Sequence, residues 1–331
     1  MPSKVAVSTM KAFRSLCILL LAALPFAANA QDFPNRLVRI VVPYPPGGGV
    51  DGLARPLADR LSRIWQQPVI VENKQGAATT IGGEFVARAP ADGYTLLLTS
   101  DSSITSNPFL FKESSLDPIR DLKPVTQLID LHQMVVVNPS VTADTLKELV
   151  ALAKRNPNAL NYGSYGNGSQ PHLLFEMLRA ETGAQIMQVP YRGIAPAITA
   201  TVAGDVQVTL GGPQTTGALI EAGRLKALAI GRQERITTFP DVPTLAEAGF
   251  PDIDPRSWFG LFAPNDTPAA LVDKIQRDVA TIFADPEFSK PFIERVGYTG
   301  VASSPAAFHD FIMDDLEYKK RLISTAGIKP E

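Results

Sequence analysis

The sequence of 331 residues contains only one cysteine and three histidines. The cysteine, Cys17, lies in an N-terminal segment that we expect to be removed, so the mature chain can form no disulfide, thiolate metal site or cysteine nucleophile. The histidines, His132, His172 and His309, are not spaced as a metal-binding pair. His172 and Glu176 lie one helical turn apart and would supply half a metal site at most. We therefore expect no metal and no cofactor.

Basic charge is also in short supply. Residues 1–30 hold three of the 31 Lys and Arg and none of the 33 Asp and Glu, so their removal leaves a net charge of −5. Nucleic acid is excluded as a partner on this ground, because phosphate binding needs clustered Lys and Arg. No charge run suggests an anionic membrane surface, and no apolar run after residue 30 is long enough to span a bilayer.

The first thirty residues have the pattern of an export signal peptide. Three basic residues before position 15 precede a short apolar run at residues 15–26, and Ala28-Asn29-Ala30 forms a small-residue cleavage site. The alternative, a retained membrane anchor, is disfavoured because the apolar run is too short. We predict cleavage after Ala30 and a periplasmic protein.

Apolar strand-like runs alternate with helical patterns over most of the chain, which indicates an α/β fold. The patterns predict strands at Val38–Val42 and Met134–Val137 and a helix at Ile194–Ala203. Prolines between residues 108 and 124 predict a long connection. We expect mainly parallel sheets flanked by helices.

The length predicts two domains. Without residues 1–30 the chain has 301 residues, more than one core usually serves. The chain is expected to cross between domains near Gln127–Leu131 and Pro251–Trp258. Residues 31–129 with 255–331 would then form domain 1 and residues 130–254 domain 2. The ligand cleft would lie between them, at the carboxyl ends of the strands.

Four loops are candidates for lining this cleft: residues 43–51, 76–82, 99–105 and 162–172. The first is a Pro- and Gly-rich loop between a predicted strand and a helix, and Asp51 is expected to be the N-cap of that helix. Its glycines would leave backbone N–H groups open to a small anion, which the helix N-terminus attracts. The fourth loop has the same strand–loop–helix setting. Two such loops favour a shared ligand.

Nucleotide and hydrolase signatures are missing from these loops. Gly47-Gly48-Gly49 lacks the spacing of a dinucleotide fingerprint, and no Gly-Lys-Ser/Thr follows for a phosphate-binding loop. Ser164 and Ser169 lie in no Gly-x-Ser-x-Gly elbow. Arg192 follows a predicted strand and could face the cleft, although an exposed turn arginine is the commoner case.

Several further motifs follow in order along the chain: Val42-Pro-Tyr-Pro-Pro-Gly-Gly-Gly-Val-Asp-Gly-Leu-Ala-Arg55, Val71-Glu-Asn-Lys74, Ala91-Asp-Gly-Tyr-Thr-Leu96, Tyr162-Gly-Ser-Tyr-Gly-Asn-Gly-Ser169, Val189-Pro-Tyr-Arg-Gly193 and Asp241-Val-Pro-Thr-Leu-Ala-Glu-Ala-Gly249. Together they resemble the Bug receptors, the periplasmic solute-binding (TctC) proteins of the tripartite tricarboxylate transporter. The resemblance implies a two-domain, type II-like periplasmic-binding-protein clamshell, or Venus flytrap. In the family, backbone groups and ordered water of two strand-to-helix loops typically grip a ligand carboxylate, and these loops match residues 43–51 and 162–172.

This chain departs from the family pattern in three places. Thr79 and Thr80 replace smaller or amide groups in the second loop, and the third loop is rich in hydroxyls. After Leu210, where relatives often carry an acidic or amide side chain, Gly211 leaves more room and weakens a grip on an ammonium group. We therefore expect a carboxylate or dicarboxylate ligand, including aromatic acids, rather than an amino acid.

The protein is predicted to be a solute-binding receptor for a transporter and not an enzyme. A monomer would bind the carboxylate and deliver it to the permease subunits of a tripartite tricarboxylate-type transporter. The alternatives are a ligand sensor for a membrane kinase and, less favoured, an exported α/β hydrolase. The predicted ligand-binding residues are Tyr44, Pro45, Gly47, Gly48, Gly49, Asp51, Thr79, Thr80, Ser100, Asp101, Ser102, Ser164, Gly166, Asn167, Gly168, Ser169, His172, Arg192 and Gly211.

Overall fold

The structure is a computed structural model that describes residues 33–330 except residues 113, 158, 233, 237, 326 and 329. By its contacts the chain divides between Asn35 and Arg36 into two units, of which the second is compact. The predicted signal peptide, residues 1–30, lies outside the described residues. Within the described part, no helix is both long and apolar enough to cross a membrane. All that follows concerns the second unit.

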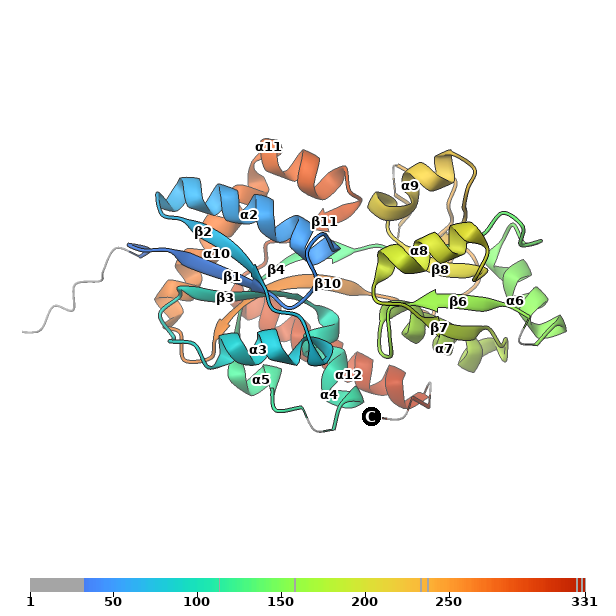
Figure 1. Cartoon of the computed structure of the whole chain (residues 1–331), viewed down its shortest axis with the longest axis horizontal. Coiled ribbons are helices and arrows are strands. Elements are labelled where there is room, and N and C mark those ends of the chain that lie inside the picture. The colour runs from blue at the N-terminus through green and yellow to red at the C-terminus, as the bar shows by residue number, and fades with distance from the viewer. Residues whose placement is uncertain are drawn as a thin grey trace, which may run out of the picture. The chain divides into compact units, whose positions relative to one another are not determined.

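The second unit contains a six-stranded sheet, called sheet A, with strand order β11-β4-β10-β3-β1-β2 (Figure 1). Its strands are β1 (Val38–Val42), β2 (Val69–Asn73), β3 (Thr95–Ser100), β4 (Leu122–Leu131), β10 (Ser257–Pro264) and β11 (Tyr298–Gly300). The accompanying helices are α2 (Gly49–Trp65), α3 (Thr80–Ala87), α4 (Asn107–Leu110), α5 (Pro118–Asp121), α10 (Ala269–Ala284), α11 (Pro286–Ser289) and α12 (Pro305–Thr325). Helices α2 and α10 cover one face, and α3 and α12 the other.

Aromatic packing fixes α12 against sheet A. Trp258 and Phe262 of β10 are buried, and so is Phe308 of α12. The rings of Trp258 and Phe308 meet edge to face, with centroids 5.2 Å apart. Burying three aromatic side chains is worth several kcal/mol, which makes this contact a main anchor of the C-terminal helix.

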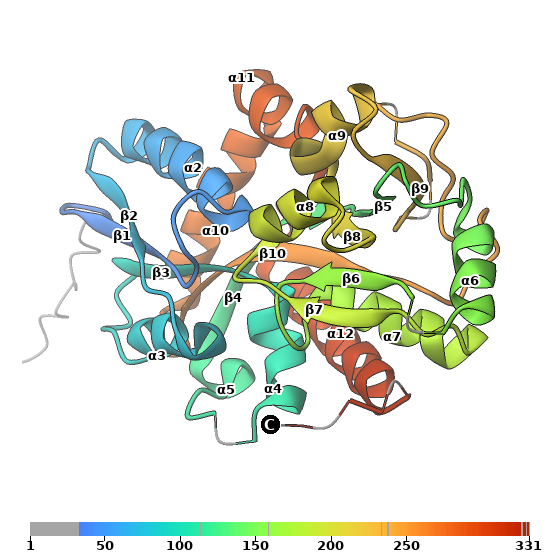
Figure 2. The same cartoon turned by 45° about the vertical axis from the view of Figure 1, so that its right-hand side comes forward.

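A five-stranded sheet, called sheet B, has the order β7-β6-β8-β5-β9 (Figure 2). Its strands are β5 (Met134–Val137), β6 (Asn161–Ser164), β7 (Met187–Pro190), β8 (Val208–Gly211) and β9 (Lys226–Ile230). Its helices are α6 (Leu146–Arg155), α7 (Gln170–Thr182), α8 (Ile194–Ala203) and α9 (Pro213–Glu221). Helix α6 begins with a capping box between Thr145 and Glu148, and its apolar face packs on the sheet.

These two helix-flanked sheets confirm the predicted α/β class, but both sheets are mixed rather than mainly parallel. In sheet A, β10 runs antiparallel to β3 and β4, and in sheet B, β5 runs antiparallel to β8 and β9. The long connection predicted from prolines is wrong in part, because β4 occupies residues 122–131. Pro124 is accommodated beside a register shift opposite Leu261 and Phe262, where the ladder is already interrupted.

The chain passes from sheet A to sheet B between β4 and β5 and returns between β9 and β10. Asp130 and Leu131, predicted to begin domain 2, pair with β10 in sheet A. Residues 36–331 form one compact unit by their contacts, so the domain limits at residues 129/130 and 254/255 stay a prediction.

Two titratable groups lie where β4 ends and the first connection between the sheets begins: Asp130 in β4 and His132 just after it. Burial raises the pKa of Asp130 to about 6, although the hydrogen bond from Gln127 Nε2 to Asp130 Oδ1, 2.6 Å long, opposes the rise. Burial and the nearby Arg232 lower the pKa of His132 to about 4. The imidazole lies 3.0 Å from Thr299 Oγ1. The fold therefore favours the neutral form of both side chains.

Candidate ligand-binding site

The first candidate loop, residues 43–51, joins β1 to α2 and is held by Asp51. The predicted N-cap at Asp51 is wrong: α2 begins at Gly49 with Gly48 as N-cap, so Asp51 lies in the first turn. Its buried carboxylate accepts hydrogen bonds from Gly47 N at 2.9 Å and Asn73 Nδ2 at 2.9 Å, and binds Arg55 through two contacts of 2.8 Å.

Asp51 therefore acts within the loop. Its burial alone would raise the pKa of the carboxyl, but the bonds from Arg55, Gly47 and Asn73 outweigh this and lower it. The N–H of Gly47 is occupied by this bond and is not open to a ligand, contrary to the expectation from the sequence. Groups still suited to an anion are the first-turn N–H groups of α2, which have no acceptor within the helix.

Tyr44 ties the first loop to the third loop, residues 99–105. Its hydroxyl lies 2.8 Å from Ser100 Oγ, 3.0 Å from Ser103 Oγ and 3.5 Å from Thr99 Oγ1. The structure thus brings together Tyr44 and Ser100, two predicted site residues, in one cluster of hydroxyls. Ser103 and Thr99 were not among the predicted site residues. The signal that selected Ser100 and Ser102, a hydroxyl side chain near the end of a strand, applies to them as well.

The predicted site residue Asp101 points away from this cluster. It is 2 % exposed, and both carboxylate oxygens are engaged by side chains of the sheet A core. Ser102, its neighbour, is half-buried and begins a π-helical turn, Ser102–Ser106. A strand end followed by alternating polar residues predicts a polar loop, but not which of its side chains turn inward.

The second candidate loop adopts an unusual left-handed turn. Gly76, Ala77, Ala78 and Thr79 all have positive φ, with Thr79 at 80°. Such angles cost a β-branched residue about 1 kcal/mol or more. Asn107 Nδ2 supports the turn by donating to Ala78 O at 2.6 Å and Thr79 Oγ1 at 3.3 Å. Thr80 begins α3, which starts where the turn ends.

The fourth loop, residues 162–172, joins β6 to α7 and binds largely to itself. Ser164 Oγ accepts from Gln188 Nε2 at 2.8 Å and Gly166 N at 3.3 Å, and Ser169 Oγ donates to Gly166 O at 2.6 Å. Gly166 and Gly168 have φ of 116° and 71°, which glycine adopts without strain.

His172 closes this loop rather than offering a metal ligand. Its Nδ1 accepts from Gly168 N at 3.0 Å, and burial lowers the pKa of the imidazole despite the opposing charge of Glu176. Glu176 itself binds Arg179 Nε at 2.8 Å. Among the described residues, no group of three His, Cys, Asp or Glu could hold a metal ion.

Tyr165, missed as a site residue, joins the fourth loop to the connection between β4 and β5. Gln133 Nε2 donates to its hydroxyl at 3.2 Å. Burial raises the pKa of the phenol, the bond from Gln133 lowers it, and the charges of Asp101 and Tyr44 raise it further. Its place between two loop glycines was the available signal.

Tyr298 of β11 adds a second connection. Its hydroxyl lies 3.2 Å from where a side chain would begin at Gly49, and Gln214 Nε2 of α9 donates to it at 3.3 Å. One phenol thus contacts the start of α2, beside sheet A, and the start of α9, beside sheet B. Tyr298 lies far along the chain from every predicted site residue, the nearest being Gly211, so no local motif indicated it.

The space expected at Gly211 is absent. A Cβ there would lie 2.3 Å from Thr216 Cγ2, so packing of α9 requires the glycine. The idea that Gly211 leaves more room for a ligand is therefore wrong. Arg192 is exposed in the turn after β7, an edge strand, and among the described residues it makes no hydrogen bond or ion pair with the four loops.

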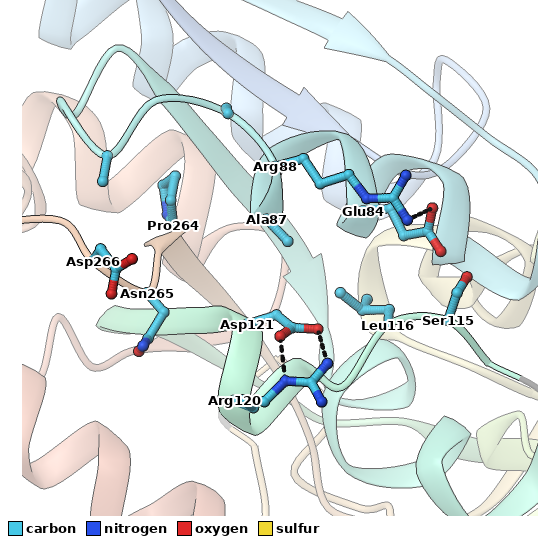
Figure 3. A pocket seen from close by; sticks show the side chains of 12 residues that line it. Glu84, Ala87, Arg88, Ser115, Leu116, Arg120, Asp121, Pro264, Asn265 and Asp266 are labelled. Carbon is cyan, nitrogen blue, oxygen red and sulfur yellow. Dashed lines mark hydrogen bonds and ion pairs between the residues drawn. The ribbon is translucent and has the colours of Figure 1, made fainter.

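A surface pocket of about 410 Å³ lies away from these loops (Figure 3). It is lined by Glu84 of α3, Arg88 at the end of that helix, Arg120 and Asp121 of α5, and Asp266 after β10. Its two guanidinium groups already face carboxylates: Arg88 contacts Glu84 at 3.2 Å and Arg120 contacts Asp121 at 2.6 Å. This pocket contains none of the predicted ligand-binding residues.

Comparison with known protein families shows which family this chain belongs to. Residues 53–328 match the family described as the tripartite tricarboxylate transporter family receptor, TctC. The chain belongs to this receptor family. The TctC relative Protein BugT of Bordetella pertussis is 33% identical over 93% of this chain and 94% of its own length.

Solved structures of similar TctC receptors include ligand complexes. A protein of R. palustris with adipate has 30% identity and a TM-score of 0.84, covering 90% of this chain and 100% of its own. MatC from Rhodopseudomonas palustris with bound malate has 26% identity and a TM-score of 0.80, covering 88% and 100%. The two-sheet arrangement of this chain is thus the periplasmic-binding-protein clamshell fold, as predicted.

Proposed function

We propose that this TctC-family protein is a periplasmic receptor that binds a small carboxylate and delivers it to a tripartite tricarboxylate-type permease. The observation that carries the proposal is that Tyr44 joins the loops after β1 and β3, and that the loop after β6 packs at Gly168 against Leu110 of α4, in a fold whose relatives hold adipate and malate. Backbone N–H groups at the starts of α2 and α7 would bind the carboxylate, directly or through water.

Capture is proposed to follow domain closure. Residues 31–129 with 255–331 would form one domain and residues 130–254 the other, closing about the two connections between the sheets. The predicted residues of the first and fourth loops would meet the ligand from opposite sides. Export to the periplasm after cleavage at Ala30 belongs to the same proposal.

The proposal includes no catalytic step. If the protein were an exported hydrolase, Ser164 would be the candidate nucleophile. Its hydroxyl accepts hydrogen bonds from the Gln188 amide and the Gly166 N–H. Neither group is a general base, and nucleophilic catalysis by serine needs one within hydrogen-bond reach. This supports reception rather than hydrolysis.

A thermal-shift screen tests the proposal. Mono-, di- and tricarboxylates, aromatic acids, amino acids and amides would be added to the mature chain. A ligand at 100 times its Kd adds about 2.7 kcal/mol of stability, which corresponds to roughly 5 °C. A shift with acids is expected. A shift with amino acids alone would contradict the ligand class. If no compound shifts the melting temperature, the protein would be unfolded, refolded and screened again. A second screen without any shift would count against a receptor function.

A variant separates loop binding from general stabilisation. Tyr44→Phe removes one hydroxyl from the Ser100 and Ser103 cluster and should weaken carboxylate binding about tenfold. The matched control is Tyr94→Phe, the same change just before β3, at the end of that strand away from the candidate loops. Equal weakening by both variants would show that the Tyr44 cluster is not at the site.

A further inference from the structure

A buried lysine lies behind the third candidate loop. Lys319 of α12 is 1 % exposed, and its ammonium donates to Asp101 Oδ2 at 3.0 Å and to the carbonyl oxygen of Arg256 at 3.1 Å. Asp101 is the first residue after β3, where the loop begins. Arg256 is the last residue of the connection that returns from sheet B to β10. One charged group therefore joins a candidate ligand loop to a connection between the sheets.

Asp315, one helical turn before Lys319, makes a parallel set of contacts. Its Oδ2 accepts from Trp258 Nε1 at 2.9 Å in β10 and from Thr105 Oγ1 at 2.7 Å in the third loop. Ser257 Oγ completes the cluster by donating to Asp101 Oδ1 at 2.7 Å. The C-terminal helix thus binds the loop and the start of β10 through two neighbouring side chains.

The third loop has an inner and an outer side. Asp101 and Thr105 are spaced by one turn and face α12, and Thr105 Oγ1 also donates to Asp101 O at 3.0 Å. Ser100 and Ser103 bond on the other side to Tyr44. A shift of the inner side must therefore displace the hydroxyls that meet the first loop.

The charges of the cluster explain why Lys319 stays ionised. Burial alone would lower the pKa of its ammonium, but Asp101 and Asp315 raise it. Burial raises the pKa of Asp315, which competes with Asp101 for the same cation. Removing the ammonium would leave two buried carboxylates facing each other without a counter-charge, a state that proteins avoid.

We propose that Lys319 is a positioning residue for ligand binding: by holding Asp101 and the Arg256 carbonyl together, it fixes the third loop relative to the connection on which closure depends. The effect on ligand binding rests on the proposed function. The mechanical part, the holding of the third loop by Lys319, does not. Lys319 does not contact the ligand. It acts through Asp101 on the Ser100 and Ser103 hydroxyls and on Tyr44.

Hydrogen exchange of the ligand-free protein tests the mechanical part. Lys319→Met should speed amide exchange at residues 100–106 and 254–258 by about tenfold or more relative to the rest of sheet A. Asp278→Asn is the matched control, because it alters another carboxylate of sheet A's helices. This one accepts from Trp65 Nε1 of α2 at 2.6 Å and from Lys274 Nζ of α10 at 2.8 Å, and neither partner lies in the four loops. Equal acceleration everywhere, or the same pattern in the control, would overturn the proposal.

Two further variants keep the test decisive where Lys319→Met folds poorly. Asp101→Asn retains an acceptor for Lys319 and a bond to Ser257, so it should loosen the same two segments to a smaller extent. The double variant Asp101→Asn with Lys319→Met removes the pair without leaving Asp101 charged, and it should exchange more slowly at these segments than Lys319→Met alone. Additive behaviour would contradict a direct coupling.

Titration with adipate tests the functional part. Asp101→Asn and Lys319→Met should raise its Kd about tenfold or more, while Asp278→Asn should leave it within about twofold. Local exchange changes with an unaltered Kd would overturn the positioning role. Absence of adipate binding by the unmodified protein would count against the ligand proposed above, and the exchange result would still decide whether Lys319 holds the loop.

Discussion

Gly168 and Leu110 offer the sharpest test of how closely the fourth loop approaches the elements beside sheet A. A Cβ at Gly168 would lie 1.9 Å from Leu110 Cδ1 of α4, well inside any real contact. Leu110 is 2 % exposed and packs with Leu173 of α7 and Leu322 of α12. Gly168→Ala must therefore displace the buried Leu110 side chain.

The expected cost has two parts. Alanine at φ of 71° loses about 1–2 kcal/mol, and overpacking against Leu110 costs about 1–3 kcal/mol more. Leu110→Ala alone should cost about 2–5 kcal/mol through its cavity. In the double variant the cavity accepts the new methyl group, so the overpacking part disappears. The double variant should be more stable than the sum of the single changes by about 1–3 kcal/mol.

Urea unfolding followed by circular dichroism would measure all four proteins. Gly183→Ala supplies the control, because Gly183 has φ of 75° and no atom within 4 Å of a Cβ built there. It should cost only the backbone part and should show no coupling to Leu110→Ala. Single costs at Gly168 and Leu110 that add within about 0.5 kcal/mol would refute the close approach of loop and helix.

Three other changes test separate parts of the structure. Thr79→Gly should raise the free energy of unfolding by about 1 kcal/mol, measured by urea unfolding, because glycine adopts φ of 80° without strain; a loss of stability would contradict the left-handed turn. Asp130 has a raised pKa of about 6 in the fold, so its contribution to stability is complete below about pH 4 and is lost as pH rises through 6. The difference in unfolding free energy between the unmodified protein and Asp130→Asn should therefore fall by about 1–3 kcal/mol from pH 4 to 7. The opposite effect of His132 is present in both proteins and cancels in this difference. A difference that does not change with pH would contradict the raised pKa. Asp51→Ala should lower the unfolding free energy by about 2–4 kcal/mol, since it leaves Gly47 N and the Asn73 amide without their acceptor, and a loss under 1 kcal/mol would show that the bonds are not made.

Local patterns predicted the local parts of this fold well. The strands Val38–Val42 and Met134–Val137 and the helix Ile194–Ala203 have the predicted limits, because apolar runs and helical spacing are properties of neighbouring residues. Strands β4 and β10 were missed. Each is defined by its pairing with the other across more than a hundred residues, and Pro124 reads as a break until that pairing is known.

The candidate site divides in the same way. Glycine-rich loops between a strand and a helix predicted the first and fourth loops. In the structure the first is joined to the third through Tyr44, and the fourth packs at Gly168 against Leu110 of α4. The roles of single side chains were less accessible. Asp101 turns inward because of Lys319, 218 positions later, and Gly211 is filled by the packing of α9. Both depend on tertiary contacts that have no sequence pattern.

The central claim is that a carboxylate is held between the loops after β1 and β6. A crystal structure of the mature chain grown with adipate, the ligand of a similar receptor, tests it most directly. The account predicts a carboxylate at the starts of α2 and α7, within direct or water-bridged hydrogen-bond distance of residues 43–51 and 162–172. Adipate bound instead in the pocket beside Arg88 and Arg120, with the loops empty, would contradict it.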